Sequence, residues 1–403
     1  MPSLHIIDYA LPDARIEALV AEVANRLPEE EFSLSLVSYG DTLRRYAALA
    51  QKLTRPVALI ETPALGYRFA VAYEQEAEFS GRTLYEVLAE SFAETDLVWF
   101  PWVHDHLFAA GSMIKAVASF HDPVPVEMAE FLTEKNGPVE AAASTGKAAM
   151  ADLATRRLMG SLAGVAAGSE RIAAYLGQTY LPKFRQPKAV PLPTPSLLAE
   201  AALPLTLPAP GYLIYCGSIA PAGNHESLLM ALAGLKRQGK SIPLALAGEG
   251  TDRIASGKGH REAYLRGLIE YLGLGIGADL HLLGPLAPGG LKSAYSQAAG
   301  AVLPALAEGE TMLAAGQAGE LGLPLACADL PAFRGYFARR GIDPQWFAPG
   351  SAEEIAAALV QLAEMPRRTA ALLPDTDWDE VAGRYLALFR EQAILASTQR
   401  ERN

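Results

Sequence analysis

Short apolar runs alternate with amphipathic helical stretches along most of the chain. This alternation is typical of βαβ units, in which helices cover both faces of a parallel sheet. In the first half the pattern predicts strands at LHIIDY, FSLSLVSY, PVALIE, DLVWFPW and KAVASFHD. In the second half it predicts strands at YLIYCGS, PLALAGEG, DLHLLGP, GAVLPAL and PLACAD. We therefore expect an α/β fold of two doubly wound domains.

A proline-rich stretch separates the two series of predicted strands. In KAVPLPTPSLLAEAALPLTLPAPGY the prolines recur too often for a helix or a central strand. We therefore predict an N-terminal domain over 1–190, a linker over 191–210 and a C-terminal domain over 211–377. Residues 378–403 carry apolar residues at helical spacing and predict an amphipathic tail helix.

The tail helix needs a residue that caps its start. Asp375 and Asp377 are the candidates for this N-cap. The triplet Asp375-Thr376-Asp377 also imitates a metal-binding sugar-nucleotide motif. Because a cap before a helix explains these residues, we assign no metal.

Charge and composition exclude some classes of partner. The chain has 403 residues, a net charge of -11 and a composition that is half hydrophobic, as in a well-packed globular protein. The negative charge disfavours nucleic acid as a partner, although a local basic patch stays open. No secretory signal and no long apolar span is evident, so we expect a cytoplasmic protein. Cys216 and Cys327 lie in apolar runs and are interpreted as small buried residues.

The loops after the predicted strands are where a ligand is expected to bind. Open α/β sheets bind ligands outside the carboxyl ends of their strands. Here those loops contain glycines that let a backbone approach a ligand closely, at 217–226, 248–250, 283–285 and 308–311. A helix starting after Glu308-Gly309-Glu310 presents free N–H groups that suit a diphosphate, although a carboxylate there also serves as a cap.

The order of these segments resembles family 4 glycosyltransferases of the GT-B fold. The likeness is most specific over 212–359, in YLIYCGSIAPAGNHESLLMAL, LALAGEG, DLHLLGPL, PALAEGE and FAPGSAEEIAAAL. The first half contributes DLVWFPWVHDHL, KAVASFHDPVP and LAGVAAGSERIAAYL. The resemblance implies two facing Rossmann-like domains with a deep interdomain cleft. It also implies that a tail helix containing Trp378 returns to the first domain.

The resemblance also implies an activity, which is transfer of a sugar from a nucleotide-diphosphate sugar to a saccharide or other hydroxyl acceptor with retention. No cofactor and no metal is required. The family's catalytic positions fall on His121 and Glu308. The family's second glutamate falls on Gln317, with Glu320 as a weaker candidate. The donor-binding positions are Gly217, Ser218, Asn224, Gly248, Gly284, Gly309, Glu310, Thr311, Met312 and Gln317.

The chain departs from the family where positive charge is expected. Relatives carry Arg or Lys in the loop GSIAPAGNHE to neutralise the leaving diphosphate, whereas this chain has Ser218, Ala222 and Gly223 at those positions. Arg253, Arg334 or His225 are the candidate replacements. The turn after the first predicted strand, Asp8 to Asp13, also lacks the glycine pair found in relatives.

Other interpretations stay open. The departures favour, as an alternative, a noncatalytic binding or partner subunit of a glycosylation system. A dehydrogenase is weaker because no G-x-G-x-x-G opens a helix after the first strand. His121 is either a site residue or a satisfied structural histidine, and His104 with His106 does not make a zinc site. The sugar, base, acceptor, oligomeric state and any peripheral membrane association are not determined by the sequence.

Overall fold

The structure is a computed structural model, and it describes residues 2–7, 14–38, 43–61, 95–101, 116–121, 159, 162–181, 186–207, 209–306, 310–368, 372 and 376–400. Two compact units divide the chain. The first contains the described residues up to 121, those from 159 to 193 and those from 376 onward, and the second contains 194–372. Among the described helices, none is long and apolar enough to cross a bilayer.

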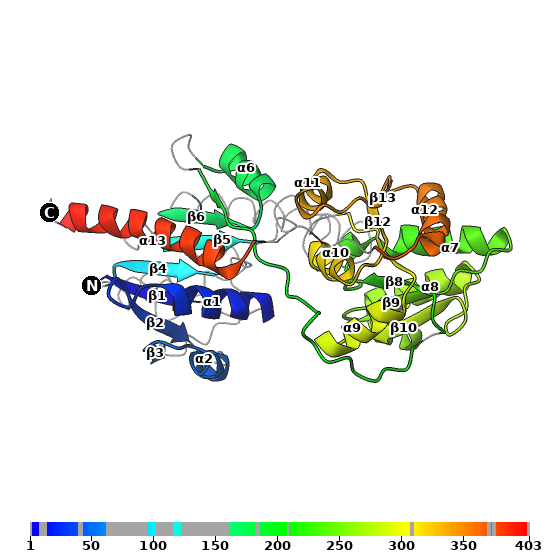
Figure 1. Cartoon of the computed structure of the whole chain (residues 1–403), viewed down its shortest axis with the longest axis horizontal. Helices are drawn as coiled ribbons and strands as arrows, with labels where there is room; N and C mark the ends of the chain where they lie inside the picture. Colours follow the sequence, from blue (N-terminus) through cyan, green and yellow to red (C-terminus); the bar gives the residue numbers. More distant parts are fainter. Residues whose placement is uncertain are drawn as a thin grey trace. The chain divides into compact units, whose positions relative to one another are not determined.

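The described residues of the first unit form a parallel sheet in the order β3-β2-β1-β4-β5-β6-β7 (Figure 1). The strands are β1 (Ser3–Ile7), β2 (Ser33–Ser38), β3 (Ala58–Glu61), β4 (Leu97–Phe100), β5 (Ala116–Phe120), β6 (Gly164–Ala167) and β7 (Lys188–Ala189). The helices are α1 (Ala14–Arg26), α2 (Leu43–Ala50), α6 (Glu170–Thr179) and α13 (Trp378–Arg400). The strand order reverses between β1 and β4, as in a doubly wound fold.

Alternate residues of the strands in this sheet supply two separate cores. In β4, Leu97 and Trp99 belong to the core under α1 and α13, whereas Val98 and Phe100 belong to the core under α6. This division follows from the strand period of two, which sends successive side chains to opposite faces. Both faces are therefore buried, which explains the continuous apolar runs in the sequence.

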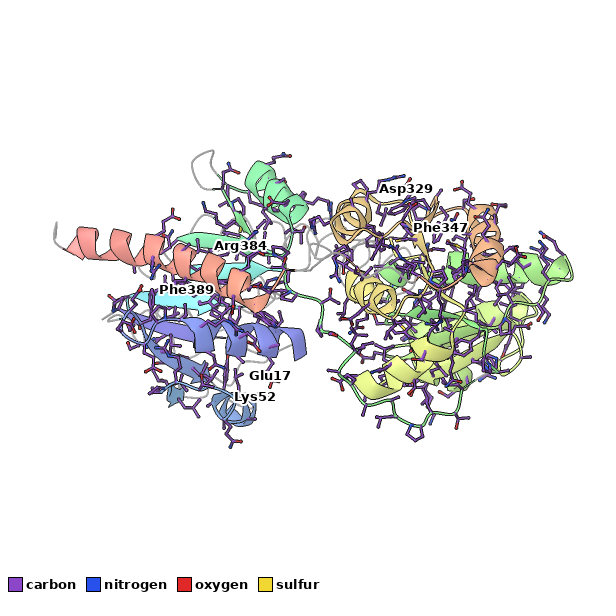
Figure 2. The ribbon with its side chains drawn as sticks, in the orientation of Figure 1. Glu17, Lys52, Asp329, Phe347, Arg384 and Phe389 are labelled. Atoms are coloured by element: carbon purple, nitrogen blue, oxygen red, sulfur yellow. The ribbon has the colours of Figure 1, made fainter. Side chains whose placement is uncertain are left out.

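The C-terminal helix α13 completes the first of these cores. Its Tyr385 and Phe389 rings lie 4.8 Å and 5.4 Å from the Trp99 ring, and Figure 2 labels Phe389 on this helix. The Ser119 hydroxyl accepts a hydrogen bond from Trp99 Nε1 at 3.0 Å and pairs with the Tyr385 hydroxyl at 2.7 Å. Asp377 Oδ1 accepts from Glu380 N at 2.7 Å, which confirms Asp377 as the N-cap.

The second unit holds a parallel sheet in the order β10-β9-β8-β11-β12-β13 over its described residues (Figure 1). Its strands are β8 (Leu213–Cys216), β9 (Leu244–Ala247), β10 (Leu280–Gly284), β11 (Gly300–Leu303), β12 (Leu325–Ala328) and β13 (Gln345–Phe347). Its helices are α7 (His225–Arg237), α8 (His260–Tyr271), α9 (Pro288–Gln297), α10 (Glu310–Glu320), α11 (Pro331–Arg340) and α12 (Ala352–Glu364), with short 3₁₀ turns η4 (Pro221–Gly223) and η5 (Thr251–Ser256).

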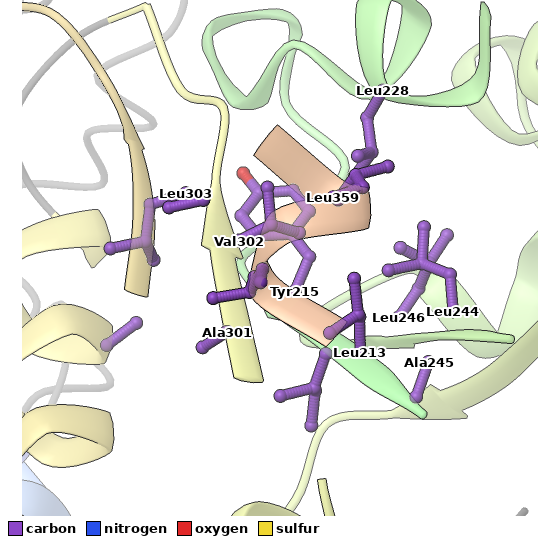
Figure 3. Close-up of a cluster of buried hydrophobic side chains, with 14 of the residues drawn as sticks. Leu213, Tyr215, Leu228, Leu244, Ala245, Leu246, Ala301, Val302, Leu303 and Leu359 are labelled. Carbon is purple, nitrogen blue, oxygen red and sulfur yellow. The ribbon is translucent and has the colours of Figure 1, made fainter. Parts of the chain in front are cut away.

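Apolar side chains of neighbouring strands form the core of the second unit together with α7 and α12. Figure 3 shows this cluster, with Leu213, Leu246, Val302, Leu228 and Leu359 among the labelled residues. Ser351 caps α12, because its hydroxyl accepts from Glu354 N at 3.2 Å. The Glu354 carboxylate in turn accepts from Ala348 N at 2.8 Å, so this side chain fixes the chain three residues before the cap.

The segment 194–207 runs along the second unit as a strap. Leu197 is buried in that unit's core. Lys292 on α9 donates to the carbonyl oxygens of Leu198 and Glu200, both at 2.7 Å. Much of the proline-rich linker is therefore bonded to the second unit, because its carbonyls find donors on α9.

Candidate functional site

The order of strands in the second unit reverses between β8 and β11. This reversal places the loop after β8 and the loop after β11 at the switch point, where doubly wound sheets bind ligands. The two loops are bonded together, since Leu306 N donates to the Ala222 carbonyl oxygen at 2.8 Å. The candidate site is therefore the carboxyl edge around residues 217–226.

Three glycines join the carboxyl ends of β8, β9 and β10. Gly217 N donates to Ala247 O at 2.9 Å, and Gly248 N donates to Gly284 O at 2.8 Å. Gly248 has φ of 125°, and a β-carbon on it would lie 2.2 Å from Gly217 O. These glycines therefore permit close contact between backbone segments of the same unit.

Two amides of these loops are already paired within the edge of the sheet. The Gly217 N–H bonds to Ala247 O, so a bond to a ligand would have to compete with it, and the donor-binding role of Gly217 stays a prediction. The Gly284 amide is engaged as well, by the Thr251 hydroxyl at 3.0 Å. That hydroxyl also donates to Gly248 O at 2.9 Å, so Thr251 joins the loop after β9 to the end of β10. The sequence did not indicate this role.

Asn224 fixes the turn between β8 and α7. It is left-handed, with φ of 54° and ψ of 40°, a conformation that Asn tolerates better than most residues. Its side-chain amide donates to Pro304 O at 2.9 Å and to Pro349 O at 2.7 Å. Asn224 thus links the loops after β8, β11 and β13. A donor-binding role for its amide nitrogen would have to compete with these bonds.

His225 is the first residue of α7 and is 1% exposed. Within the described residues, neither ring nitrogen has a hydrogen-bond partner. Burial, followed by the positive charge of Arg261, lowers the pKa of His225 to about 4. The imidazole is therefore neutral at pH 7 and does not supply the missing positive charge.

Arg261 supplies a cation at this loop from the first turn of α8. Its Nε donates to Ile219 O at 2.7 Å, and its two terminal nitrogens contact the Glu226 carboxylate, one of them at 3.0 Å. Burial alone would raise the pKa of Glu226, but the bonds from Arg261 outweigh it and hold this pKa below its ordinary value. Sequence reasoning missed Arg261, because it lies 42 residues from Ile219 and no local pattern joins them.

The two arginines that the sequence offered as replacements are each paired with a carboxylate. Arg253 Nε donates to Glu262 at 3.0 Å from the η5 turn after β9. Arg334 makes two bonds to Asp329, one at 2.6 Å, and lies 4.8 Å over the Trp346 ring. Asp329 N donates to Phe347 O at 2.8 Å, and Figure 2 labels both of these residues. Arg334 therefore belongs to the β12 and β13 end of the edge.

Gln317 and Glu320 on α10 both bind the strap. Gln317 Nε2 donates to Pro195 O at 3.2 Å, and Glu320 Oε2 accepts from Leu197 N at 2.9 Å. Gln317 is buried, so its amide group has little freedom to turn elsewhere. Met312 is half-buried against the core of the unit. The two residues considered for the family's second glutamate thus hold the chain segment 195–197.

Several site residues fall on or beyond the limits of the description. Glu308 and Gly309 lie outside the described residues, as do Asp122, His104 and His106. Glu310 and Thr311 are described in their backbone, which opens α10. The free N–H groups of the first turn of this helix remain the candidates for binding an anion.

His121 and Ser218 complete the set of predicted residues. His121 follows β5 in the first unit, where a β-carbon on Gly168 would lie 3.3 Å from its Nδ1. Gly168 therefore makes room for the histidine ring at the end of β6. Ser218 is partly buried in the loop after β8. The sequence-based hypothesis for both side chains stays a prediction.

Neither cysteine has the properties of a nucleophile. Both are free thiols, and Cys327 is fully buried. Burial raises the pKa of Cys216 to about 12 and raises the pKa of Cys327 well above its ordinary value. Because the thiolate is the reactive form, both groups are inert near neutral pH, as the sequence indicated.

Comparison with solved structures shows the fold. The chain is 13% identical to Anabaena Alr3699/HepE, solved in complex with UDP and glucose, with a TM-score of 0.56 over 100% of this chain and 99% of that one. A glycosyltransferase from Rickettsia africae is 12% identical, with a TM-score of 0.54 over 98% of this chain and 93% of that one. A UDP-forming trehalose-phosphate synthase from Burkholderia xenovorans is 12% identical, with a TM-score of 0.57 over 99% and 98%.

The fold is the α/β, two-domain GT-B fold of glycosyltransferases, which confirms the resemblance seen in the sequence. Residues 207–373 also match the family model described as glycosyl transferases group 1. A comparison with curated proteins gives no match. The matched residues are those that build the second unit and its carboxyl edge, and the match supports the glycosyltransferase class for this chain.

Proposed function

We propose that the protein is a retaining glycosyltransferase that moves a hexosyl group from a nucleotide-diphosphate sugar to a hydroxyl group of a saccharide acceptor. The observation that carries the proposal is the family match over 207–373, which coincides with a sheet whose switch point is built from glycine loops. One relative of the same fold was solved with UDP and glucose. That complex supports a donor of the same chemical class.

The proposed donor site uses the loop after β8 and the start of α10. Backbone N–H groups in the first turn of α10, including Glu310 and Thr311, bind the diphosphate, since unpaired amides at a helix start attract anions. Thr251 and Asn224 keep the neighbouring loops in place through the bonds described above. In this proposal their role is to hold the edge rigid while the donor binds.

The proposed catalytic groups are Glu308 and His121, on the motif positions that the sequence supplied. The nucleotide diphosphate leaves, positive charge develops on the anomeric carbon, and the acceptor hydroxyl attacks the same face of the sugar. A carboxylate near that carbon stabilises the oxocarbenium-like charge, as in glycoside hydrolysis. His121 orients the sugar. In this proposal the reaction needs neither a cofactor nor a metal ion.

The test is calorimetric titration of the protein with UDP, GDP and ADP, followed by turnover with the matching nucleotide sugars. We expect one nucleoside diphosphate to bind at micromolar to millimolar concentration and one donor to be consumed. Glu308→Gln removes the charge and is expected to reduce turnover by at least about 100-fold with unchanged nucleotide affinity. Glu364→Gln, on the exposed end of α12, is the matched control.

A noncatalytic partner subunit is the second candidate. It is favoured by the bond from Gln317 to Pro195, which occupies the residue at the family's second carboxylate position. It is also favoured by the pairing of Arg334 with Asp329. This alternative predicts no heat with any nucleotide and no turnover with any donor, so the titration above separates the two functions.

A further inference from the structure

We propose that Arg261 supplies the positive charge that the diphosphate of the donor requires at the loop after β8. The inference rests on the proposed function. It names a residue of α8 as the replacement for the cations that the loop itself lacks at Ser218, Ala222 and Gly223. Arg261 would then be a donor-affinity determinant that comes from a different helix.

The contacts of Arg261 place its guanidinium group at that loop. Its Nε donates to Ile219 O at 2.7 Å, which ties it to the backbone of the loop. Its side chain is 14% exposed, so its charge is less screened by solvent than a charge on the surface. The field of this charge reaches the start of α7, because Arg261 contributes to the lowered pKa of His225.

The Arg261 guanidinium group has N–H groups that its bonds to described residues do not use. Arginine carries five N–H donors, and the bonds made to described residues use three of them, one to Ile219 and two to Glu226. Each terminal nitrogen therefore has a second N–H that no bond to a described residue uses. Planar guanidinium groups bind phosphate oxygens well through such donors.

The position of Arg261 within α8 is unfavourable by itself. It lies in the first turn of the helix, where the helix dipole disfavours a cation. Glu226 in the first turn of α7 offsets that cost through the ion pair. The Glu226 carboxylate thus holds the Arg261 guanidinium group in place. It also lowers the net positive charge at the loop.

The other candidates are less suited to this role. His225 is neutral, as its lowered pKa shows. Arg253 is half exposed and paired with Glu262. Arg334 is exposed and held by both oxygens of Asp329 at the end of β12. Among the described residues, Arg261 is the basic side chain that bonds directly to the backbone of the loop 217–224.

The competing explanation is that the Arg261–Glu226 ion pair has only a structural role. The two explanations are distinguished by substitutions that remove opposite charges from the pair. Arg261→Met removes the cation, whereas Glu226→Gln removes the carboxylate and retains an acceptor for Arg261. Both changes break the same ion pair. If the pair is only structural, both variants weaken nucleotide binding or leave it alone. If Arg261 serves the diphosphate, the two variants shift affinity in opposite directions.

The experiment measures the affinity of the full-length protein for the nucleoside diphosphate that binds the wild type, and for the corresponding nucleoside. We expect Arg261→Met to weaken diphosphate binding about tenfold and Glu226→Gln to strengthen it about threefold. Nucleoside affinity is expected to change less than about twofold in either variant. Arg266→Met and Glu270→Gln, an exposed pair on the same helix, are the matched controls and should leave both affinities unchanged.

The outcomes separate the inference from the function on which it rests. If the wild type binds no nucleoside diphosphate, the proposed function fails. If it binds, but both variants shift diphosphate affinity in the same direction or not at all, the assignment of Arg261 is overturned. If Arg261→Met does not fold, Glu226→Gln alone decides, because only the charge-based assignment predicts tighter binding that weakens more steeply with salt than in the wild type.

Discussion

The side-chain amide of Gln317 donates a hydrogen bond to the carbonyl oxygen of Pro195 at 3.2 Å. This bond joins α10 to the strap 194–207, and it is made by a buried side chain. A carboxylate at the same position could not donate it, because an ionised carboxylate only accepts hydrogen bonds. The amide at position 317 is thus suited to the contact that this chain makes.

Gln317→Glu is accordingly expected to destabilise the protein at pH 7. The free energy of unfolding should fall by about 1 to 3 kcal/mol, because the new carboxylate and the Pro195 carbonyl oxygen are both acceptors and neither can donate a hydrogen bond. The loss should shrink near pH 5, where a protonated carboxyl group donates again. Denaturant unfolding at the two pH values measures both effects. Gln238→Glu, at the exposed end of α7, is expected to change stability by less than about 0.5 kcal/mol.

Gly248→Ala is expected to destabilise the second unit by about 2 to 4 kcal/mol. Its φ of 125° is rarely adopted by residues with a β-carbon, and that atom would lie 2.2 Å from Gly217 O. Gly234→Ala in α7 is the matched control, since nothing lies within 4 Å of its added β-carbon. That control should gain about 0.5 to 1 kcal/mol from helix propensity. Equal effects of the two substitutions would contradict the close contact at the edge.

The buried His225 is expected to make the protein less stable as the pH falls. In the folded protein its pKa is lowered to about 4, chiefly by burial, whereas an unfolded histidine has a pKa near 6.5. Between these values the unfolded chain binds a proton that the folded protein does not, so unfolding becomes easier as the pH falls from about 6.5 to 4. The expected loss at pH 5 is about 2 kcal/mol. His225→Gln should remove this part of the pH dependence in denaturant unfolding at pH 7 and pH 5, and an unchanged slope would count against the buried neutral imidazole.

Ser119 and Tyr385 predict unequal losses of stability. Tyr385→Phe removes one partner of the Ser119 hydroxyl, and we expect a loss of about 1 kcal/mol. Ser119→Ala leaves the Trp99 and Tyr385 donors buried without an acceptor, and we expect about 2 to 3 kcal/mol. Urea unfolding measures both, with Tyr271→Phe on the exposed face of α8 as the control. A larger loss for Tyr385→Phe than for Ser119→Ala would contradict this account.

Much of the fold could be predicted because its signals are local. The apolar runs coincide with β1 to β5 and with β8 to β12, and the helix cap at Asp377 follows from a side chain beside the helix that it starts. β6, β7 and β13 escaped prediction. β7 and β13 have two and three residues and are too short to show a hydrophobic pattern, and β6 is the four-residue run GVAA, in which three residues are Gly or Ala.

The parts of the site that escaped prediction depend on contacts between distant residues. The Asn224 amide reaches carbonyls 80 and 125 residues away, and Arg261 reaches Ile219 across 42 residues. No spacing in the sequence marks such pairs. The bonds from the Gly217 and Gly248 amides to neighbouring strands are likewise not marked by any local pattern, and the donor-binding role of both glycines stays a prediction.

The position of α13 has a consequence for the order in which the protein matures. Tyr385 and Phe389 cover Trp99, yet they are synthesised after every strand of both sheets. During translation the described residues of the second unit, 194–372, are synthesised before helix α13 of the first unit. Domains generally fold as their chain becomes available. The first unit therefore lacks the Tyr385 and Phe389 contacts with Trp99 until α13 has been synthesised.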